Sequence, residues 1–298
     1  MVSKGPQVSI GMPVYNGADF LRDAIDSLLA QTFEDFEIII SDNASTDATE
    51  SICRDYTAAD SRIRYYRSAE NRGAAWNYNY CVEQARGEYF KWAAHDDVCA
   101  PEFLRQCVAT LQSAGPQAVL AYPRSLLIDE TGAIVGRHES GLDLRNRTPH
   151  ARIRDFARRQ NKANPVFGLM RTDALRRTRG HGNFPNADIV LLLELALLGQ
   201  MWEVDDWLFL RRVHAGNSCA ANRSIKDRAI WFDPQNVRKR VWLPLAQVFF
   251  ESLSAIRRTG LPTVEASLCY AVFTWEATKR LVMRPTNYWQ VNGARLDY

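Results

Sequence analysis

The chain has 298 residues, enough for one large α/β domain with a helical addition. The formal net charge of +3 is too small to require a nucleic-acid partner, and we expect none. The six cysteines show neither a CxxC pair nor zinc-type spacing, which argues against a disulfide framework and indicates a reducing cytosol.

Strand-like and helix-like segments alternate over the first half of the chain. Apolar, β-branched runs predict strands at 8–14, 36–41, 63–66, 88–94 and 118–122. Periodic apolar positions predict helices at 17–31, 47–56, 74–85 and from Pro101 onward. We expect Asn16 to cap the first helix. This alternation with short connections predicts a parallel sheet covered on both faces.

The middle of the chain is less regular. Residues 129–132 predict a turn between strands 125–128 and 133–137. A polar, basic segment from Arg145 to Arg179 contains a predicted helix at 150–160, and its cations suit a solvated face or a phosphate-bearing substrate. Residues 189–198 are apolar nearly all round and predict a buried helix, and 207–213 predict a strand.

Two apolar stripes predict a helical hairpin from about residue 236 to 284. We expect the stripes to pack on each other and on the main domain. Basic residues flank the hairpin, so peripheral membrane contact and a homodimer interface are the alternatives. The N-terminus soon enters a strand and no run of about 18 apolar residues occurs, so we expect no signal peptide or span. The expected location is the cytoplasm, with the inner face of the membrane as the alternative.

Two adjacent acids, Asp96 and Asp97, follow the apolar and aromatic run 88–94. Their charges repel, so they are tolerated where they face solvent or where a cation shares the site. Mg²⁺ is usually held by one or two carboxylates together with substrate phosphates. The pair is therefore a candidate metal–diphosphate site, and a solvated loop is the alternative.

Other polar residues follow neighbouring predicted strands, where ligands bind in open α/β sheets. Asp42 suits a hydrogen bond from a base N–H, Tyr15 suits stacking, Arg72 suits phosphate, and Gly73 permits close backbone approach. Turn and loop chemistry explains each of them taken alone. No phosphate-binding glycine motif follows a strand, so a metal would have to neutralise a diphosphate.

The segments 8–16, 41–49, 71–75 and 95–97, in this order and spacing, resemble the nucleotide-sugar-binding half of family 2 inverting glycosyltransferases, which have the GT-A fold. The resemblance covers roughly residues 1–115 and, more loosely, 160–220. It implies that Asp42 contacts the nucleobase, that Asp96 lies near ribose and sugar, and that Asp97 coordinates Mg²⁺ or Mn²⁺. The nucleotide-sugar-binding residues that we expect are Pro13, Tyr15, Asn16, Asp42, Asn71, Arg72, Gly73, Asp96, Arg211 and Arg212.

Inverting transfer needs a base that deprotonates the acceptor hydroxyl. By the resemblance this acid precedes a helix, often as Glu-Asp, and the matching residues here are Ala187-Asp188. Asp188 is therefore the candidate base, and capping of its helix is the alternative role. Glu194 is a second candidate, although it lies inside the apolar helix.

The segment 210–218 resembles one that closes over the diphosphate in relatives. His214 would then be a third metal ligand and Arg211 or Arg212 a phosphate ligand, whereas a plain loop role is the alternative for His214. The QxxRW pattern of processive members is absent, which favours transfer of a single sugar.

We therefore expect an α/β protein with a GT-A-type mixed, mainly parallel sheet, helices on both faces and a C-terminal helical hairpin. Residues 1–235 would form the catalytic domain, with a donor half at 1–115 and an acceptor half at 116–235, and 236–298 a helical extension. The expected activity is Mn²⁺- or Mg²⁺-dependent transfer of one sugar from a nucleoside diphosphate sugar, UDP first, to a glycan, lipid-linked or small-molecule hydroxyl. A sugar nucleotidyltransferase and an inactive glycan-binding module are the alternatives.

Overall fold

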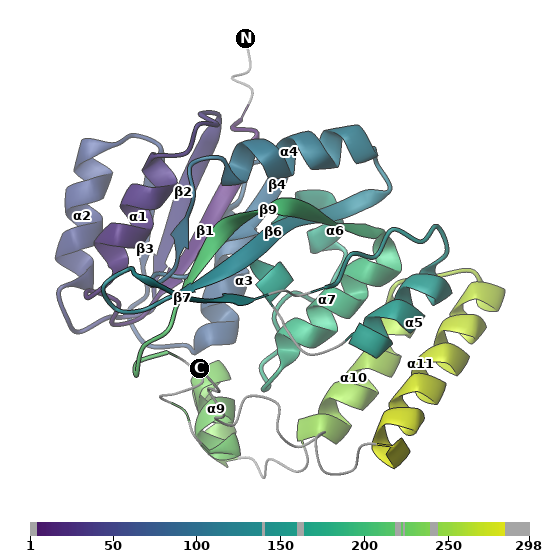
Figure 1. Cartoon of the computed structure of the whole chain (residues 1–298). Helices are drawn as coiled ribbons and strands as arrows, with labels where there is room; N and C mark the ends of the chain where they lie inside the picture. Colours follow the sequence, from purple (N-terminus) through teal and green to yellow (C-terminus); the bar gives the residue numbers. More distant parts are fainter. Residues whose placement is uncertain are drawn as a thin grey trace.

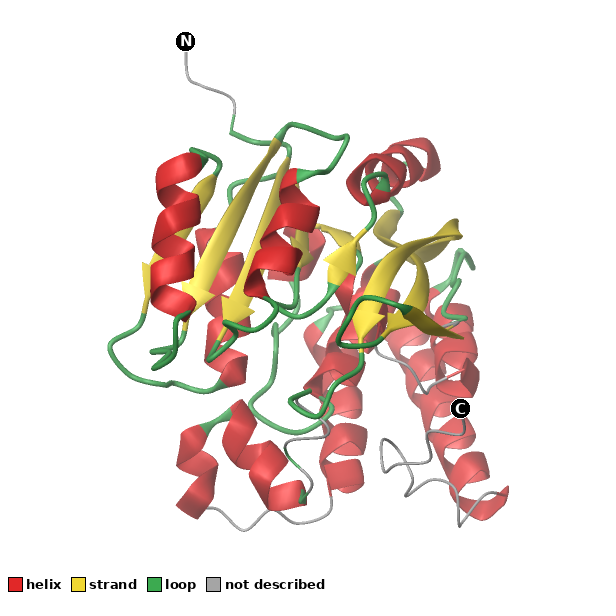
Figure 2. Ribbon diagram, turned by 60° about the vertical axis from the view of Figure 1, so that its left-hand side comes forward, coloured by secondary structure: helices red, strands yellow, loops and turns green. Residues whose placement is uncertain are grey.

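The computed structural model describes residues 5–138, 141–159, 164–217, 222, 224–238 and 244–283. Across these ranges nine strands form one mixed sheet with helices on both faces (Figures 1 and 2). The strand order is β3-β2-β1-β4-β8-β6-β9-β5, and β7 pairs with β6. The architecture confirms the predicted α/β class.

The first four strands in this order are parallel, and so is the pair β6–β9. The antiparallel pairs among the described strands are β4–β8, β6–β8, β6–β7 and β5–β9. The strands are β1 (Val8–Val14), β2 (Phe36–Asp42), β3 (Ile63–Arg67), β4 (Tyr89–Trp92), β5 (Val98–Cys99), β6 (Ala118–Ile128), β7 (Ile134–His138), β8 (Leu169–Arg171) and β9 (Gln200–Arg212).

Each face of the sheet carries its own core, because side chains alternate across a strand. On β2, Ile38 and Ile40 face the core that holds α1 (Leu21–Leu29), α2 (Thr49–Ala59) and α4 (Phe103–Ala114). Ile39 faces the other core. The helices of that core are α3 (Ala74–Gln84), α5 (Pro149–Arg159), α6 (Thr172–Arg176), α7 (Ala187–Leu198), α10 (Pro244–Arg258) and α11 (Thr263–Met283).

The first helix begins later than predicted, and the expected cap at Asn16 is wrong. Asn16 has a φ of 50°, and α1 starts at Leu21 without a side-chain cap. The amides that precede the helix bind the loop after β2 instead: Gly17 N–H donates to Thr49 Oγ1 at 2.9 Å and Ala18 N–H to Asp47 Oδ2 at 3.1 Å. These bonds hold residues 16–18 against the loop after β2 instead of in a helix.

Two strands, β6 and β9, are longer than predicted. The predicted strand at 207–213 is the last part of β9, which begins at Gln200. The predicted segments 118–122 and 125–128 form a single strand, β6, whose pairing with β9 shifts register around Pro123 and Arg124. The apolar pattern breaks at these residues, which explains why the sequence suggested two strands.

The predicted helix at 150–160 is α5, and Gln160 lies outside the described residues.

The C-terminal helices α10 and α11 pack on α7 and α5 (Figure 1). Ala255, Ile256, Cys269 and Phe273 are buried in the core that these helices share with the sheet. A shorter helix, α9 (Ile225–Phe232), and the 3₁₀ turns η1 (Asn164–Phe167) and η2 (Pro234–Arg238) complete the described elements. Residues 239–243 and 284–298 of the predicted extension lie outside them. In the described parts, no helix combines the length and the apolar character needed to cross a membrane.

Several arginines of the basic segment 145–179 bind the protein's own carbonyl groups. Arg152 is buried and donates from Nε to Ala196 O at 2.6 Å and from Nη2 to Leu197 O at 3.1 Å, which caps the end of α7. Arg171 donates to Ala118 O at 2.9 Å. These side chains therefore stabilise the fold, whereas the sequence suggested a solvated face or a phosphate ligand.

Glu194 links α7 to α10 through a buried ion pair. Its side chain is 1% exposed, and Oε1 accepts hydrogen bonds from Nε and Nη2 of Arg258 at 2.9 and 2.8 Å. Its Oε2 accepts the Arg179 N–H at 3.0 Å. This carboxylate is fully occupied inside the fold, which leaves the base assignment to Asp188.

We predict that Glu194→Ala lowers the free energy of unfolding by about 1.5–3 kcal/mol, because it removes the acceptor of the Arg179 N–H and the buried partner of the partly exposed Arg258. Urea denaturation followed by circular dichroism measures this loss. Asp55→Ala is the matched control, since its ion pair with Arg22 is solvent-exposed and should contribute less than about 1 kcal/mol. Equal losses in the two variants would contradict the structural role of Glu194.

Candidate active site

A cleft of about 840 Å³ opens beyond the carboxyl ends of β1 and β4. This is where open α/β sheets bind ligands, and the volume suits a small-molecule site. Its walls come from the segments after β1, β4 and β9 and from the start of α7, which are far apart in sequence. The predicted site residues that line it are Tyr15, Asn16, Asp96, Asp97, Asp188, Arg211 and His214.

The segment after β9 closes onto Asp96. Asp96 Oδ2 lies 3.0 Å from His214 Nε2 and accepts a hydrogen bond from Asn217 Nδ2 at 3.0 Å. The His214 ring also packs against Phe20 in a tilted arrangement, with 4.7 Å between ring centroids. These contacts bring Asp96 and His214 together at one wall of the cleft, as both were expected to lie near the donor.

Asp97 is held more deeply than Asp96. Its side-chain Oδ1 accepts the Arg212 N–H at 2.8 Å, and the residue is 8% exposed. Burial, and then the charge of Asp96, raise the pKa of Asp97, while Arg211 and the buried Lys91 act in the opposite direction. The carboxyl group is therefore in a position that favours a proton or a cation.

Asp188 lies in the first turn of α7, on the side of the cleft formed by that helix. The chain reaches the helix through Asn186, which has a φ of 63°, and Asp188 Oδ1 accepts the Ile189 N–H at 2.9 Å. Burial raises the pKa of Asp188, partly offset by that hydrogen bond and by Arg211. Asp188 is partly buried and lines the cleft, and a carboxylate there with a raised pKa is a candidate proton acceptor.

Tyr78 of α3 lines the same cleft as Asp96, Asp97 and Asp188. Burial is the main cause of its raised pKa, and the charges of the three acids all add to it. The three acids therefore face a common space with this phenol. The cleft therefore contains a set of acids of the kind that binds cations and accepts protons.

The two neighbouring arginines of β9 have different surroundings, because adjacent residues of a strand face opposite sides. Arg211 lines the cleft and reaches Asn164 Oδ1 at 3.4 Å. Arg212 is 2% exposed and donates to the carbonyls of Asp96, Asp129 and Glu130 and to Asp23. Arg211 is thus the arginine available to a ligand, and Arg212 is engaged within the protein.

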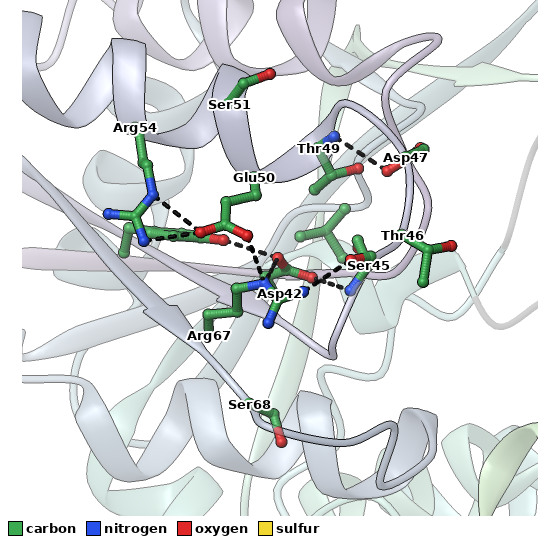
Figure 3. A network of polar contacts seen from close by, with 12 residues as sticks. Asp42, Ser45, Thr46, Asp47, Thr49, Glu50, Ser51, Arg54, Arg67 and Ser68 are labelled. Atoms are coloured by element: carbon green, nitrogen blue, oxygen red, sulfur yellow. Dashed lines mark hydrogen bonds and ion pairs between the residues drawn. The ribbon is translucent and has the colours of Figure 1, made fainter.

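Asp42 is fully buried at the end of β2 in a network of polar contacts (Figure 3). Its side chain accepts the Ser45 N–H at 2.8 Å and the Tyr65 hydroxyl at 2.7 Å, and it lies 3.5 Å from Arg67 Nε. Asn16 joins this network to the cleft, because its Oδ1 accepts the Thr46 N–H at 2.8 Å. Asp42 itself is not among the residues that line the cleft.

The remaining predicted residues, Pro13 and the segment Asn71-Arg72-Gly73, lie beside the cleft and are not part of its lining. Asn71 Oδ1 accepts a hydrogen bond from Asn43 Nδ2 at 2.9 Å, and Arg72 lies 4.3 Å from the centre of the Trp76 ring. Gly73 has a φ of 85°, and a Cβ there would lie 2.5 Å from Phe232 O. The close approach expected at this glycine is thus made by the protein's own backbone.

Sequence reasoning missed Tyr78, His181 and Asn217 as lining residues. Tyr78 lies inside a helix and His181 in a loop, and neither falls in a motif. Tyr78 and His181 come together because α3 and the loop before α7 lie side by side, joined by hydrogen bonds between Asn79 and His181. A helical projection of 74–85 would have shown only that Tyr78 shares a face with Ala75, Cys81 and Val82.

The glycosyl transferase family 2 model matches residues 9–181 of the chain. An uncharacterised glycosyltransferase of Rickettsia felis is 40% identical over 130 residues, which cover 43% of this chain and 21% of the relative. The match covers only 21% and 38% of the length of the first two curated relatives, which are both 40% identical to this chain over the matched residues. The putative teichuronic acid biosynthesis glycosyltransferase TuaG of Bacillus subtilis is 24% identical over 285 residues, or 94% of this chain and 99% of TuaG.

Two solved structures share the fold. TarS 1–349 of S. aureus in complex with UDP-GlcNAc aligns with a TM-score of 0.68 and 16% identity over 98% of this chain and 77% of its own. The mannosyltransferase PcManGT of Pyrobaculum calidifontis, in complex with GDP-Man and Mn²⁺, aligns with a TM-score of 0.56 and 16% identity over 96% and 84%.

The family match covers more than half of the chain, and the structural matches extend over nearly all of it. Both agree with the resemblance found in the motifs of the first half, including the expected GT-A type of fold. The chain belongs to glycosyl transferase family 2.

Proposed function

We propose that this glycosyltransferase moves one sugar, with inversion, from a nucleoside diphosphate sugar to a hydroxyl of a glycan, a lipid-linked glycan or a small molecule. The observation that carries the proposal is the convergence of Asp96, Asp97 and Asp188 on Tyr78 in one cleft. These acids come from two distant parts of the sequence, so no local turn explains their meeting. Addition of a single sugar follows from the lack of a QxxRW pattern.

The nucleoside would lie between the cleft and the Asp42 network. Tyr15 and Asn16 line the cleft, and Asn16 connects to Ser45 and Thr46 next to Asp42. Asp42 would orient the segment that meets the base, and Arg211 would meet the phosphates. Uridine is the first candidate base, because TarS was solved with UDP-GlcNAc, and guanosine follows from the GDP-Man complex of PcManGT.

The acids fit a divalent cation, Mn²⁺ or Mg²⁺. Burial and then the charge of Asp96 raise the pKa of Asp97, so a cation beside the pair would be favoured. Among the described residues no cluster of three potential ligands occurs, so substrate phosphates would have to complete the coordination. Asp97 would hold the cation first, and His214 would join if it released Asp96. When bound, the cation would neutralise charge on the departing diphosphate.

Asp188 would take the proton of the acceptor hydroxyl as that oxygen attacks the anomeric carbon. Its burial makes it a stronger base than a free aspartate, since the pKa is raised. Its Oδ1 is oriented by the Ile189 N–H, which fixes the carboxylate at the helix start. The carboxylate would thus be held in place before the acceptor binds.

The wider assignment keeps residues 1–115 as the donor half, 116–235 as the acceptor half and 236–298 as a helical extension. TuaG, whose description names teichuronic acid biosynthesis, supports a polysaccharide acceptor. The extension presents exposed apolar side chains on α11, with Val264 75% and Trp275 68% exposed. This surface is compatible with a cytoplasmic enzyme at the inner face of a membrane or in a homodimer.

We predict that Asp97→Asn and Asp188→Asn each lower kcat by about 10²–10⁴-fold, because they remove the cation ligand and the proton acceptor. The assay is release of nucleoside diphosphate from UDP-GlcNAc, UDP-glucose and GDP-mannose with an acceptor panel and Mn²⁺, with EDTA as a second arm.

Asp206→Asn is the control, since this aspartate pairs with Gln106 outside the cleft and should keep wild-type activity. Full activity in both Asp97→Asn and Asp188→Asn would overturn the assignment. Loss in the control as well would show a general effect on folding.

We predict that kcat/KM rises with pH along an acid limb whose midpoint lies above about 3.9, the ordinary aspartate pKa. Asp188 must be ionised to accept a proton, and burial raises its pKa, so activity is lost as pH falls through that raised value. Rates between pH 4 and 9 give the midpoint, with tryptophan fluorescence confirming a folded enzyme. An acid limb centred at or below the ordinary value would contradict the role of Asp188.

A further inference from the structure

His181 is a buried imidazole in the wall of the cleft with no hydrogen-bond partner for either ring nitrogen among the described residues. The residue is 8% exposed, and burial lowers the pKa of its side chain to about 4, so the ring is neutral at physiological pH. Buried polar atoms are nearly always paired, so an unpaired imidazole indicates a group that a ligand satisfies. A neutral imidazole offers one donor and one acceptor.

The protein holds the His181 backbone firmly. Asn79 of α3 accepts the His181 N–H on Oδ1 at 2.8 Å and donates from Nδ2 to His181 O at 2.9 Å. The preceding Gly180 has a φ of 70°, and a Cβ there would lie 2.4 Å from Asn79 Oδ1. The loop before α7 is thus fastened to α3, and the imidazole position is built in before any ligand arrives.

The His181 ring lies against aromatic side chains that connect it to the acids. Its centroid is 4.5 Å from that of Tyr78 and 5.2 Å from that of Trp92. Tyr78 in turn feels the charges of Asp96, Asp97 and Asp188. Tyr78 and His181 line the same cleft as Asp97 and Asp188, so a molecule that spans the cleft between these two acids comes near His181.

We propose that His181 hydrogen-bonds a hydroxyl of the transferred sugar and helps to select it, an inference that rests on the proposed function. A sugar hydroxyl is both donor and acceptor and can pair with a neutral imidazole. The Tyr78 ring, which lines the cleft beside His181, offers an apolar surface to the sugar's C–H face. The transferred sugar would lie between the diphosphate at Asp97 and the candidate catalytic base Asp188, in the same cleft as Tyr78 and His181.

The test compares nucleoside diphosphates with their sugar nucleotides. UDP, UDP-GlcNAc, GDP and GDP-mannose are titrated with Mn²⁺ into the wild type, His181→Phe and His181→Gln by calorimetry. Phenylalanine keeps the ring packing but has no polar atom, so the sugar nucleotide that the wild type binds best should bind about tenfold more weakly. The Kd of the matching diphosphate should not change, and glutamine, which has a donor and an acceptor, should restore most of the loss.

Equal weakening of diphosphate and sugar nucleotide would show a structural role and overturn the inference, as would unchanged binding or an effect confined to the acceptor KM. A wild type that binds none of the four nucleotides would instead overturn the proposed function. If His181→Phe fails to fold, His181→Met against His181→Gln makes the same comparison with side chains of equal length. Indistinguishable sugar-nucleotide affinities in that pair would also overturn the inference.

Discussion

Negative charge buried in one cleft is the constraint to which much of this structure responds. Asp97 is buried and Asp188 is partly buried, and transfer of a carboxylate into a low-dielectric site is costly unless other groups compensate. The protein compensates in part, through the Arg212 N–H on Asp97 and through Arg211 near both acids. The raised pKa values of Asp97 and Asp188 record what remains uncompensated. A cation that arrives with the donor would stabilise the ionised carboxylates, so the free protein would favour binding of the donor together with a cation.

The scaffold holds these acids from several sides. Arg212 joins the carbonyl of Asp96, the turn after β6 and Asp23 on α1, so one buried guanidinium connects β9 with three other segments around the cleft. Glu194 ties α7, the helix that carries Asp188, to α10 through Arg258. Arg152 caps the far end of α7. The C-terminal helices thus contribute to the site by fixing the helix on which the candidate base stands, although they contact no candidate ligand.

The sequence was most informative where local pattern and chemistry agree. Strand ends are visible as apolar runs that stop at polar residues, so Asp96 and Asp97 could be placed at a ligand-binding edge of the sheet before any coordinates. Asp188 was added to that site only through the resemblance to family 2 glycosyltransferases. Asn16 was misjudged as a cap because its left-handed backbone and its bonds to the loop after β2 depend on tertiary contacts. The same holds for Arg152 and Arg171, whose partners are carbonyls distant in sequence. Which of Arg211 and Arg212 faces the cleft depends on strand register, and His181 becomes visible only when its unpaired nitrogens can be seen.

The central claim is that the carboxylates around Tyr78 form the donor site. Crystals soaked with UDP and Mn²⁺, measured at the manganese absorption edge, test it most directly because anomalous scattering locates the ion independently of the nucleotide. The account predicts a peak in coordination contact with an Asp97 oxygen, with the diphosphate in the same cleft and the uridine toward the Asp42 network. A manganese peak and a nucleotide bound elsewhere, with the cleft around Asp97 and Asp188 unchanged, would contradict it.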